Sequence, residues 1–365
     1  MNVDREALRT KLGTLTDPGT GKSYAELGMV KDVVIDGGHV TLSVELTSPA
    51  TAGRGAIEKA VRGTAADAGA ADVEIVFTSN VRMRQVAGDD PCPDVKNVIM
   101  VVAGKGGVGK STVAANLTMA LHRAGAKVGL LDADIYGPSI PTMMGIDGRP
   151  MSSDGKRIEP MERFGVKIMS IGFLLEDPKT AVVWRGPMLH GALMQFLKDV
   201  NWGKLDYLVL DMPPGTGDVA LTMAQKVKVT GAVVVTTPQE VALMDVYKAI
   251  SMCQKLNVPI LGIVENMSYF VDAAGNRNEI FGRGGGEKAA AHAKAPLLGL
   301  VPIDTSVREW GDNGTPVVQA QPESSVAKVF TEIAAKLADR VTMELNALYG
   351  GVAPVAGPKR LPIMR

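Results

Sequence analysis

Residues 104–112 combine glycines, lysines and hydroxyl side chains in an order that suits a phosphate chain. The residues that match the pattern G-x-x-x-x-G-K-[ST] are Gly104-Lys105-Gly106-Gly107-Val108-Gly109-Lys110-Ser111, and Thr112 follows them. Glycines allow a tight turn in which successive backbone N–H groups point at phosphate oxygens. Lys110 would neutralise charge on the β- and γ-phosphates, and the Ser111 hydroxyl would bind Mg²⁺. The segment therefore predicts a site for ATP and Mg²⁺.

A chance match is the alternative, because the chain has 41 glycines. The context argues against it. The apolar run Val98–Ala103 precedes the loop and predicts a strand, and Ser111–Ala124 predicts a helix that begins at about Lys110. A helix that begins here would add its positive end to the phosphate site.

A second lysine, Lys105, stands at the start of the loop. With it, the loop resembles the deviant Walker A loop of the P-loop family that includes MinD, ParA, the nitrogenase iron protein and Mrp-type iron–sulfur carriers. The resemblance implies a homodimer in which Lys105 reaches the partner subunit's nucleotide. A cation supplied only on assembly can stabilise transition-state charge. A solvated surface lysine is the alternative.

Carboxylates follow two apolar runs that predict strands. Asp132 and Asp134 follow the apolar residues Val128–Leu131, and Asp211 ends Tyr207–Asp211. Ligands of α/β proteins bind at the carboxyl ends of the strands. An aspartate at a strand end beside a phosphate loop is the usual Mg²⁺ partner, directly or through water, although Asp211 could instead cap a helix or turn.

Strand and helix patterns alternate from Asn97 onward. The apolar runs that predict strands are Val98–Ala103, Val128–Asp132, Tyr207–Asp211, Ala232–Thr236, Ile260–Glu265 and Leu297–Leu300. Helical patterns intervene, such as Val241–Leu256, and a last helix is expected from about Glu323 to Leu348. This alternation predicts an α/β P-loop NTPase fold, with a mainly parallel sheet covered by helices on both faces.

A small α/β domain is expected before this sheet. Val40 to Leu46 alternate in polarity, and the turn residues Asp36-Gly37-Gly38 predict an antiparallel partner at Val30–Ile35. A helix is expected at Ala56–Ala68 and a further strand at Val73–Phe77. The predicted divisions are a domain at 1–81, a linker at 82–96, an ATPase domain at 97–348 and a flexible tail at 349–365.

The motifs of the larger domain resemble the Mrp (ApbC) family of iron–sulfur cluster carrier ATPases, in the family's order. The matching segments are Asp132-Ala133-Asp134-Ile135-Tyr136-Gly137-Pro138-Ser139, Trp184-Arg185-Gly186-Pro187-Met188, Asp211-Met212-Pro213-Pro214-Gly215-Thr216-Gly217-Asp218, Thr237-Pro238-Gln239-Glu240 and Glu265-Asn266-Met267-Ser268. The resemblance implies that Asp134 orients the attacking water, that Asp132 and Asp211 serve Mg²⁺, and that Asn266 contacts adenine. Arg185 has two open roles, a phosphate or partner contact and an ordinary surface position.

The first domain is similar to the small SufT-related iron–sulfur assembly domain. The similar segments are Asp17-Pro18, Glu26-Leu27-Gly28 and Leu46-Thr47-Ser48-Pro49-Ala50. Many members of that family have Cys-Pro directly after the last segment, where this chain has Thr51-Ala52. A thiol role for this module is therefore not expected.

Cysteine usage departs from the carrier pattern. Carriers of the Mrp family usually have C-x-x-C shortly after Glu-Asn-Met-Ser-Tyr-Phe, so that two subunits supply four thiolates. Here Val271 to Arg277 contain no cysteine. Cys253 lies in a helical pattern and is expected in the core, whereas Cys92 in the linker could be exposed and could pair with its symmetry mate. The sequence therefore offers no convincing ligand for an iron–sulfur cluster.

The composition of the chain limits the kinds of partner and the location that we expect. The 39 basic and 39 acidic residues cancel, which gives no general attraction to nucleic acid or membranes. The N-terminal segment is charged from Asp4, and the longest apolar runs are too short for a bilayer, so a cytoplasmic location is expected.

Three functions remain open. The first is a dimeric ATP-hydrolysing carrier that acts in iron–sulfur cluster assembly and meets apo iron–sulfur proteins. The second is a MinD/ParA-like positioning switch, which needs an amphipathic or basic surface that the last helix does not display. The third is an ATPase scaffold or metallochaperone that no longer binds a cluster.

Overall fold

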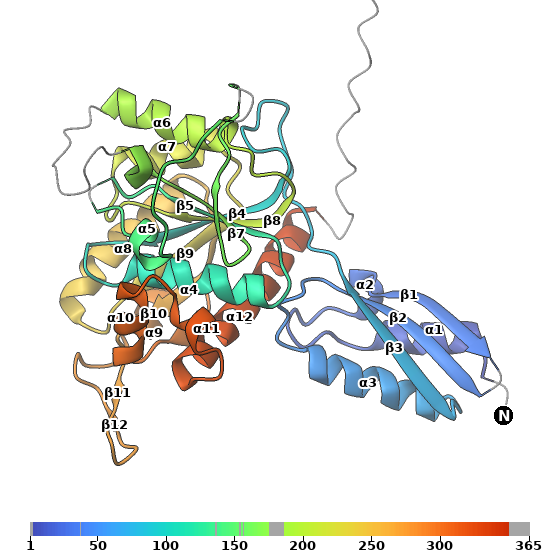
Figure 1. The fold of residues 1–365 in the computed structure, drawn as a ribbon. Helices are drawn as coiled ribbons and strands as arrows, with labels where there is room; N and C mark the ends of the chain where they lie inside the picture. The colour runs from blue at the N-terminus through green and yellow to red at the C-terminus, as the bar shows by residue number, and fades with distance from the viewer. Residues whose placement is uncertain are drawn as a thin grey trace, which may run out of the picture.

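The computed structural model describes residues 3–349, except residues 37, 136, 153, 154, 156 and 175–185. Figure 1 shows a small N-terminal unit beside a larger one that contains a wide sheet. Arg185 and the tail from residue 350 lie outside the described residues, so the expectations for them are not addressed by the structure.

The small unit packs helices against one three-stranded sheet of order β1-β2-β3. Its elements are α1 (Arg5–Thr14), α2 (Tyr24–Leu27), β1 (Val30–Asp36), β2 (His39–Leu46), α3 (Arg54–Asp67) and β3 (Asp72–Ser79). The predicted hairpin is confirmed, because β1 pairs with β2 antiparallel and Asp36 lies opposite His39. The unit has a core of its own, centred on apolar side chains of β2 and α3.

The larger unit is built on an eight-stranded sheet of order β13-β10-β9-β4-β8-β5-β7-β6. Its strands are β4 (Val95–Ala103), β5 (Val128–Asp132), β6 (Met161–Arg163), β7 (Val166–Ser170), β8 (Leu205–Asp211), β9 (Gly231–Thr236), β10 (Ile260–Glu265) and β13 (Leu297–Leu300). All neighbours are parallel except β6 and β7, which run antiparallel at one border. Parallel strands covered on both faces are continuous apolar runs, and β4, β5 and β9 are buried almost throughout.

Helices cover both faces of this sheet, as Figure 1 shows. The helices are α4 (Lys110–Arg123), α5 (Ile140–Met143), the 3₁₀ turn η1 (Ile171–Leu174), α6 (Gly186–Lys198), α7 (Asp218–Lys226), α8 (Glu240–Lys255), α9 (Gly285–Ala293), α10 (Thr305–Asp312), α11 (Val317–Ala320) and α12 (Ser325–Tyr349). On one face α12 packs along α4, whereas α8 and α9 pack together against β9 and β10. A short hairpin of β11 (Phe270–Val271) and β12 (Arg277–Asn278) extends away from the sheet. The predicted mainly parallel α/β fold is confirmed.

The segment between the units is held by a buried ion pair. Arg84 donates to both oxygens of Asp90, one of them at 2.9 Å, and both side chains are 1% exposed. Arg84 also donates to the Cys92 carbonyl oxygen at 3.0 Å. Because β4 begins at Val95, the last two residues of the expected linker belong to that strand. The division into domains stays a prediction.

Side-chain hydrogen bonds among the described residues link the small unit to the large one. The hydroxyl groups of Ser48 and Tyr207 lie 3.1 Å apart in a buried position. Thr51 donates to Asp339 Oδ1 at 2.9 Å, and burial raises the pKa of Asp339 to about 6. Thr51 stands where the assembly family often has cysteine, and here it serves the contact between the units.

Candidate functional site

The ends of three neighbouring strands bring the predicted site together. β4 lies between β9 and β8, and β5 pairs with the other side of β8. Asp132 and Asp211 are direct register partners at the ends of β5 and β8. The phosphate loop begins directly after β4 and ends where α4 begins at Lys110. The strand order therefore places both carboxylates beside the loop.

The loop uses glycine where side chains would not fit. Gly107 and Gly109 have φ of +81° and +79°, which is left-handed backbone that glycine adopts without strain. A Cβ on Gly104 would overlap the Asp245 backbone of α8, so this glycine allows the close approach of that helix. The loop encloses one side of a cavity of about 280 Å³. The predicted site residues that line it are Lys105, Gly106, Gly107, Gly109, Lys110, Ser111, Thr112 and Asp134.

Lys110 is the charge at the centre of the site. Its ammonium lies 2.6 Å from Asp211 Oδ1 and 3.5 Å from Asp134 Oδ2, and the side chain is 7% exposed. Its Nζ also lies 3.3 Å from Ser111 Oγ. One cation thus faces two carboxylates, in a place where few water molecules can screen them.

Asp132 is fully buried, and hydrogen bonds engage both of its oxygens. The Asp134 N–H donates to Oδ1 at 3.1 Å, and Ser170 Oγ and the Ile140 N–H donate to Oδ2 at 2.9 and 3.3 Å. Burial, and then the nearby Asp211 charge, raise the pKa of Asp132 to about 8. This carboxylate therefore holds the turn after β5, and we expect any contact with Mg²⁺ to pass through water.

Asp211 is better placed for a cation. Burial raises the pKa of its carboxyl group, and Lys110 opposes that rise. Its Oδ2 is buried and accepts no hydrogen bond from the described residues. A divalent cation would satisfy this orphaned oxygen.

The donor set suits magnesium in particular. In the described part of the chain, no group of three or more His, Cys, Asp or Glu side chains is arranged to hold a metal ion. Mg²⁺ usually keeps several waters and takes few protein ligands together with substrate phosphates. The Ser111 hydroxyl and the Asp211 carboxylate, which lie next to Lys110, fit that pattern.

Two further predicted residues, Lys105 and Asn266, lie at the phosphate loop. Lys105 is half-buried and lines the cavity. Asn266 is 6% exposed and its Nδ2 donates to the Val108 carbonyl oxygen at 2.9 Å, so it supports the loop from behind. The contact of Asn266 with adenine stays a prediction.

Sequence reasoning missed Ser170, which fixes Asp132 from the end of β7. That strand has only five residues, and its Lys167 interrupts the apolar pattern, so only its position before the Gly172 turn could have indicated it. Met143, which also lines the cavity, was not singled out either.

Both cysteines are free thiols in buried positions. The expectation that Cys92 could be exposed is wrong, because the residue is 4% exposed and packs beside Arg84. Cys253 is 1% exposed, which confirms its predicted core position. Where carriers have C-x-x-C, Asp272 instead closes the turn of the β11–β12 hairpin, with the N–H groups of Ala274 and Asn276 donating to Oδ1 at 3.0 and 2.8 Å.

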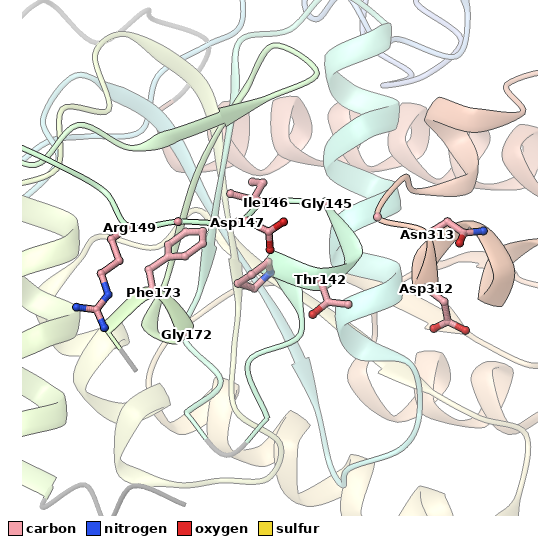
Figure 2. Close-up of a pocket in the computed structure, with 12 residues that line it drawn as sticks. Thr142, Gly145, Ile146, Asp147, Arg149, Gly172, Phe173, Asp312 and Asn313 are labelled. Carbon is pink, nitrogen blue, oxygen red and sulfur yellow. The ribbon is translucent and has the colours of Figure 1, made fainter. Parts of the chain in front are cut away.

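A larger cavity of about 530 Å³ lies next to the phosphate site. α5 takes part in both, since Met143 lines the phosphate cavity and Thr142 lines the larger one. Figure 2 shows Arg149 and Phe173 on one side of this cavity and Asp312 and Asn313 on the other. The two cavities share no lining residue among those that the structure describes.

No helix in the described ranges has the length and apolar character needed to cross a membrane.

Two protein families match the chain. Residues 94–338 match the family described as ParA: NUBPL iron-transfer P-loop NTPase, and residues 5–76 match the family of iron-sulfur cluster assembly proteins. The iron-sulfur cluster carrier protein of Synechocystis sp. is 48% identical over 349 residues, which cover 93% of this chain and 98% of that protein. The carrier protein of Escherichia coli (strain K12) is 52% identical over 280 residues, which cover 76% and 74%.

Solved structures resemble about two thirds of the chain. A nucleotide-binding protein from Archaeoglobus fulgidus in complex with ADP superposes with a TM-score of 0.54 at 43% identity, over 60% of this chain and 87% of that one. The cell division ATPase MinD of Pyrococcus furiosus gives a TM-score of 0.50 at 27% identity, over 66% and 97%.

Proposed function

This chain belongs to the family described as ParA: NUBPL iron-transfer P-loop NTPase, and from that premise we propose that it binds and hydrolyses Mg-ATP as a homodimer that serves iron–sulfur cluster assembly or transfer. The observation that carries the proposal is the buried contact of Lys110 with Asp211 directly behind the glycine loop. A buried lysine between carboxylates can exchange one anionic partner for another. A triphosphate that enters the cavity would offer it β- and γ-phosphate oxygens.

The side chains divide the work of hydrolysis. Bound Mg²⁺ would supply a Lewis acid that neutralises phosphate charge, and Ser111 and Asp211 would hold it. Asp134 lines the cavity and lies 3.5 Å from the Lys110 ammonium. From there its carboxylate can accept a hydrogen bond from a water and hold that water in the direction of the γ-phosphate. Asp132 keeps the backbone of Asp134 in place through the 3.1 Å hydrogen bond.

The homodimer would complete the site with Lys105. Its half-buried side chain lies at the rim of the cavity, with no hydrogen bond or ion pair to another described residue. An ammonium group at the rim can approach phosphate groups bound by a second subunit. Hydrolysis would then depend on assembly, as it does where an arginine finger is added in trans.

The cluster is cargo in this proposal, and two versions of the function remain. As a carrier, the dimer would hold a cluster for transfer to apo iron–sulfur proteins, as the names of its relatives suggest. As a scaffold, it would use ATP to organise assembly without holding the cluster. The burial of Cys92 and Cys253 and the hairpin closed by Asp272 favour the scaffold version.

Two measurements test the proposal. Calorimetric titration of the full chain with ATP and Mg²⁺ should show saturable binding, and phosphate release should require Mg²⁺. The function is rejected if no adenine nucleotide binds. Anaerobic reconstitution with iron and sulfide, followed by visible absorbance and iron quantification, separates the versions. A brown protein with stoichiometric iron supports the carrier, and a colourless ATPase supports the scaffold.

A further inference from the structure

The turn that follows β10 has an unusual backbone. Met267 has φ of +54°, in the left-handed region that non-glycine residues rarely adopt. Such a conformation persists only where the surrounding contacts determine it, and it often marks a functional position. The turn joins the end of β10 to the β11–β12 hairpin, and its contacts reach the phosphate loop.

The two residues at the centre of the turn hold that loop. Asn266 Nδ2 donates to the Val108 carbonyl oxygen at 2.9 Å. A Cβ added to Gly109 would overlap Asn266 Nδ2 and would lie 3.7 Å from the Met267 Cε atom. Asn266 and Met267 therefore form the wall against which Val108 and Gly109 pack.

This contact also sets the direction of an N–H group. The Val108 carbonyl and the Gly109 N–H belong to one planar trans peptide, so they point in opposite directions. Val108 is 2% exposed, whereas Gly109 lines the phosphate cavity. When Asn266 binds the carbonyl oxygen on the buried side, the Gly109 N–H is turned toward the cavity, where a phosphate oxygen can accept from it.

Glu265 fixes the turn from inside the protein. Its side chain is 1% exposed. Ser268 Oγ donates to Oε1 and the Gly286 N–H donates to Oε2, both at 2.5 Å. The Glu265 carbonyl oxygen also accepts from the Val301 N–H at 2.8 Å. Within the described residues no lysine, arginine or histidine forms an ion pair with Glu265, so hydrogen bonds alone hold this buried side chain.

We propose that Glu265 is a positioning residue for the phosphate loop: its carboxylate ties Ser268 and the start of α9 to the turn, and so keeps Asn266 and Met267 against Val108 and Gly109. The inference rests on the proposed function, because the loop must bind a nucleotide for its shape to matter. It assigns to Glu265 a role in nucleotide affinity in addition to fold stability. Glu265 acts on the loop through Asn266, which donates to the Val108 carbonyl oxygen.

The test separates positioning from stability with matched variants. Asn266→Ala removes a buried amide that supports the loop. Asn97→Ala removes a buried amide that donates to the Arg82 carbonyl oxygen at 2.8 Å, near the start of β4 and away from the site. Calorimetry with ADP and ATP, and thermal unfolding, are measured for both variants. We expect the Kd to rise about tenfold in Asn266→Ala and to stay within about twofold of the wild type in Asn97→Ala, although both melt at lower temperature.

Glu265 is tested by a graded series. Glu265→Ala should raise the Kd and the KM for ATP about tenfold with little change in kcat, because the loop binds ground state and transition state alike. Glu265→Gln keeps an acceptor for the Gly286 N–H and a donor for Ser268 Oγ, so it should restore the Kd to within about threefold of the wild type. Asp339→Asn, which changes a buried carboxylate at the contact with the small unit, is the matched control and should not alter the Kd.

The outcomes discriminate. If Glu265→Ala and Asn266→Ala melt earlier but bind nucleotide with the wild-type Kd, the inference is wrong while the proposed function stands. Equal loss of affinity in the controls also rejects it. Should Glu265→Ala fail to fold, Glu265→Asp, whose carboxylate is shorter by one methylene group, takes its place in the series. A wild-type protein that binds no nucleotide rejects the proposed function itself.

Discussion

The Lys110 ammonium lies 2.6 Å from the Asp211 carboxylate, and the two side chains are 7% and 0% exposed. Each group is the other's main compensation for burial, because removal of one partner of a buried pair leaves an uncompensated charge. The pair also keeps the lysine at the floor of the phosphate cavity. Binding and stability are therefore linked at this position.

Lys110→Ala should abolish hydrolysis. Loss of the ammonium removes the charge that faces the phosphates, and we expect phosphate release to fall on the order of 100-fold or more. Without Lys110, which lowers the pKa of Asp211, that pKa should rise further. The exposed Lys59→Ala on α3 is the control for loss of a lysine. Turnover of Lys110→Ala at the wild-type rate would contradict the site assignment.

Lys105→Ala should separate binding from turnover. Because Lys105 lies at the rim and pairs with no described residue, the Kd for ATP should change by less than about threefold. Hydrolysis should fall at least about tenfold, if the lysine acts on the partner subunit's nucleotide. Phosphate release measured against protein concentration checks this, since the wild type should gain specific activity as it dimerises. A variant with full activity would leave Lys105 as an ordinary surface residue.

The contact between the two units should depend on pH because it includes Asp339. Burial raises its pKa from 3.8 to about 6, so the folded protein binds this proton more tightly than the unfolded chain does. The stabilisation is complete below about pH 4 and is lost as the pH rises through about 6. The free energy of unfolding of the wild type, relative to Asp339→Asn, should therefore fall between these values. Denaturant unfolding at several pH values measures it, and the exposed Asp67→Asn should show no such difference.

Both thiols should be slow to react in the native protein. Burial raises the pKa of Cys92 to about 12 and that of Cys253 to about 11, and only the thiolate is nucleophilic. We expect a chromogenic disulfide reagent at pH 8 to label neither cysteine within minutes, and to label both at once in denaturant. Rapid labelling of one thiol in the native protein would mean that a cysteine is accessible to a metal.

The sequence allowed the main framework to be predicted because its central strands are continuous apolar runs. β4, β5, β8, β9 and β10 lie where those runs indicated, and the loop after β4 encloses the predicted cavity. Short elements were not predicted. β6 has only three residues, and Lys167 interrupts the apolar run of β7, so Ser170 was missed with them.

Contacts between distant segments also could not be read from local patterns. The sequence placed Arg84 and Asp90 in a linker and left Cys92 open to solvent. In the tertiary structure all three side chains are buried. Asn266 matched a family motif, but its hydrogen bond to Val108 depends on how β10 lies against the loop, 158 residues apart in sequence. Such contacts follow from the packing of the whole sheet and not from propensity.

Both edges of the wide sheet are poorly suited to pairing with a strand from another molecule. At one border β6 is only three residues long and carries the exposed Glu162 and Arg163. At the other, α12 crosses beside β13, and Lys336 donates to the Leu298 carbonyl oxygen at 3.0 Å. A strand from another molecule would meet a short, charged edge strand at the first border. At the second it would meet a carbonyl oxygen that already accepts a hydrogen bond. The described sheet therefore offers little free backbone at either border for pairing with a strand from another copy of this chain.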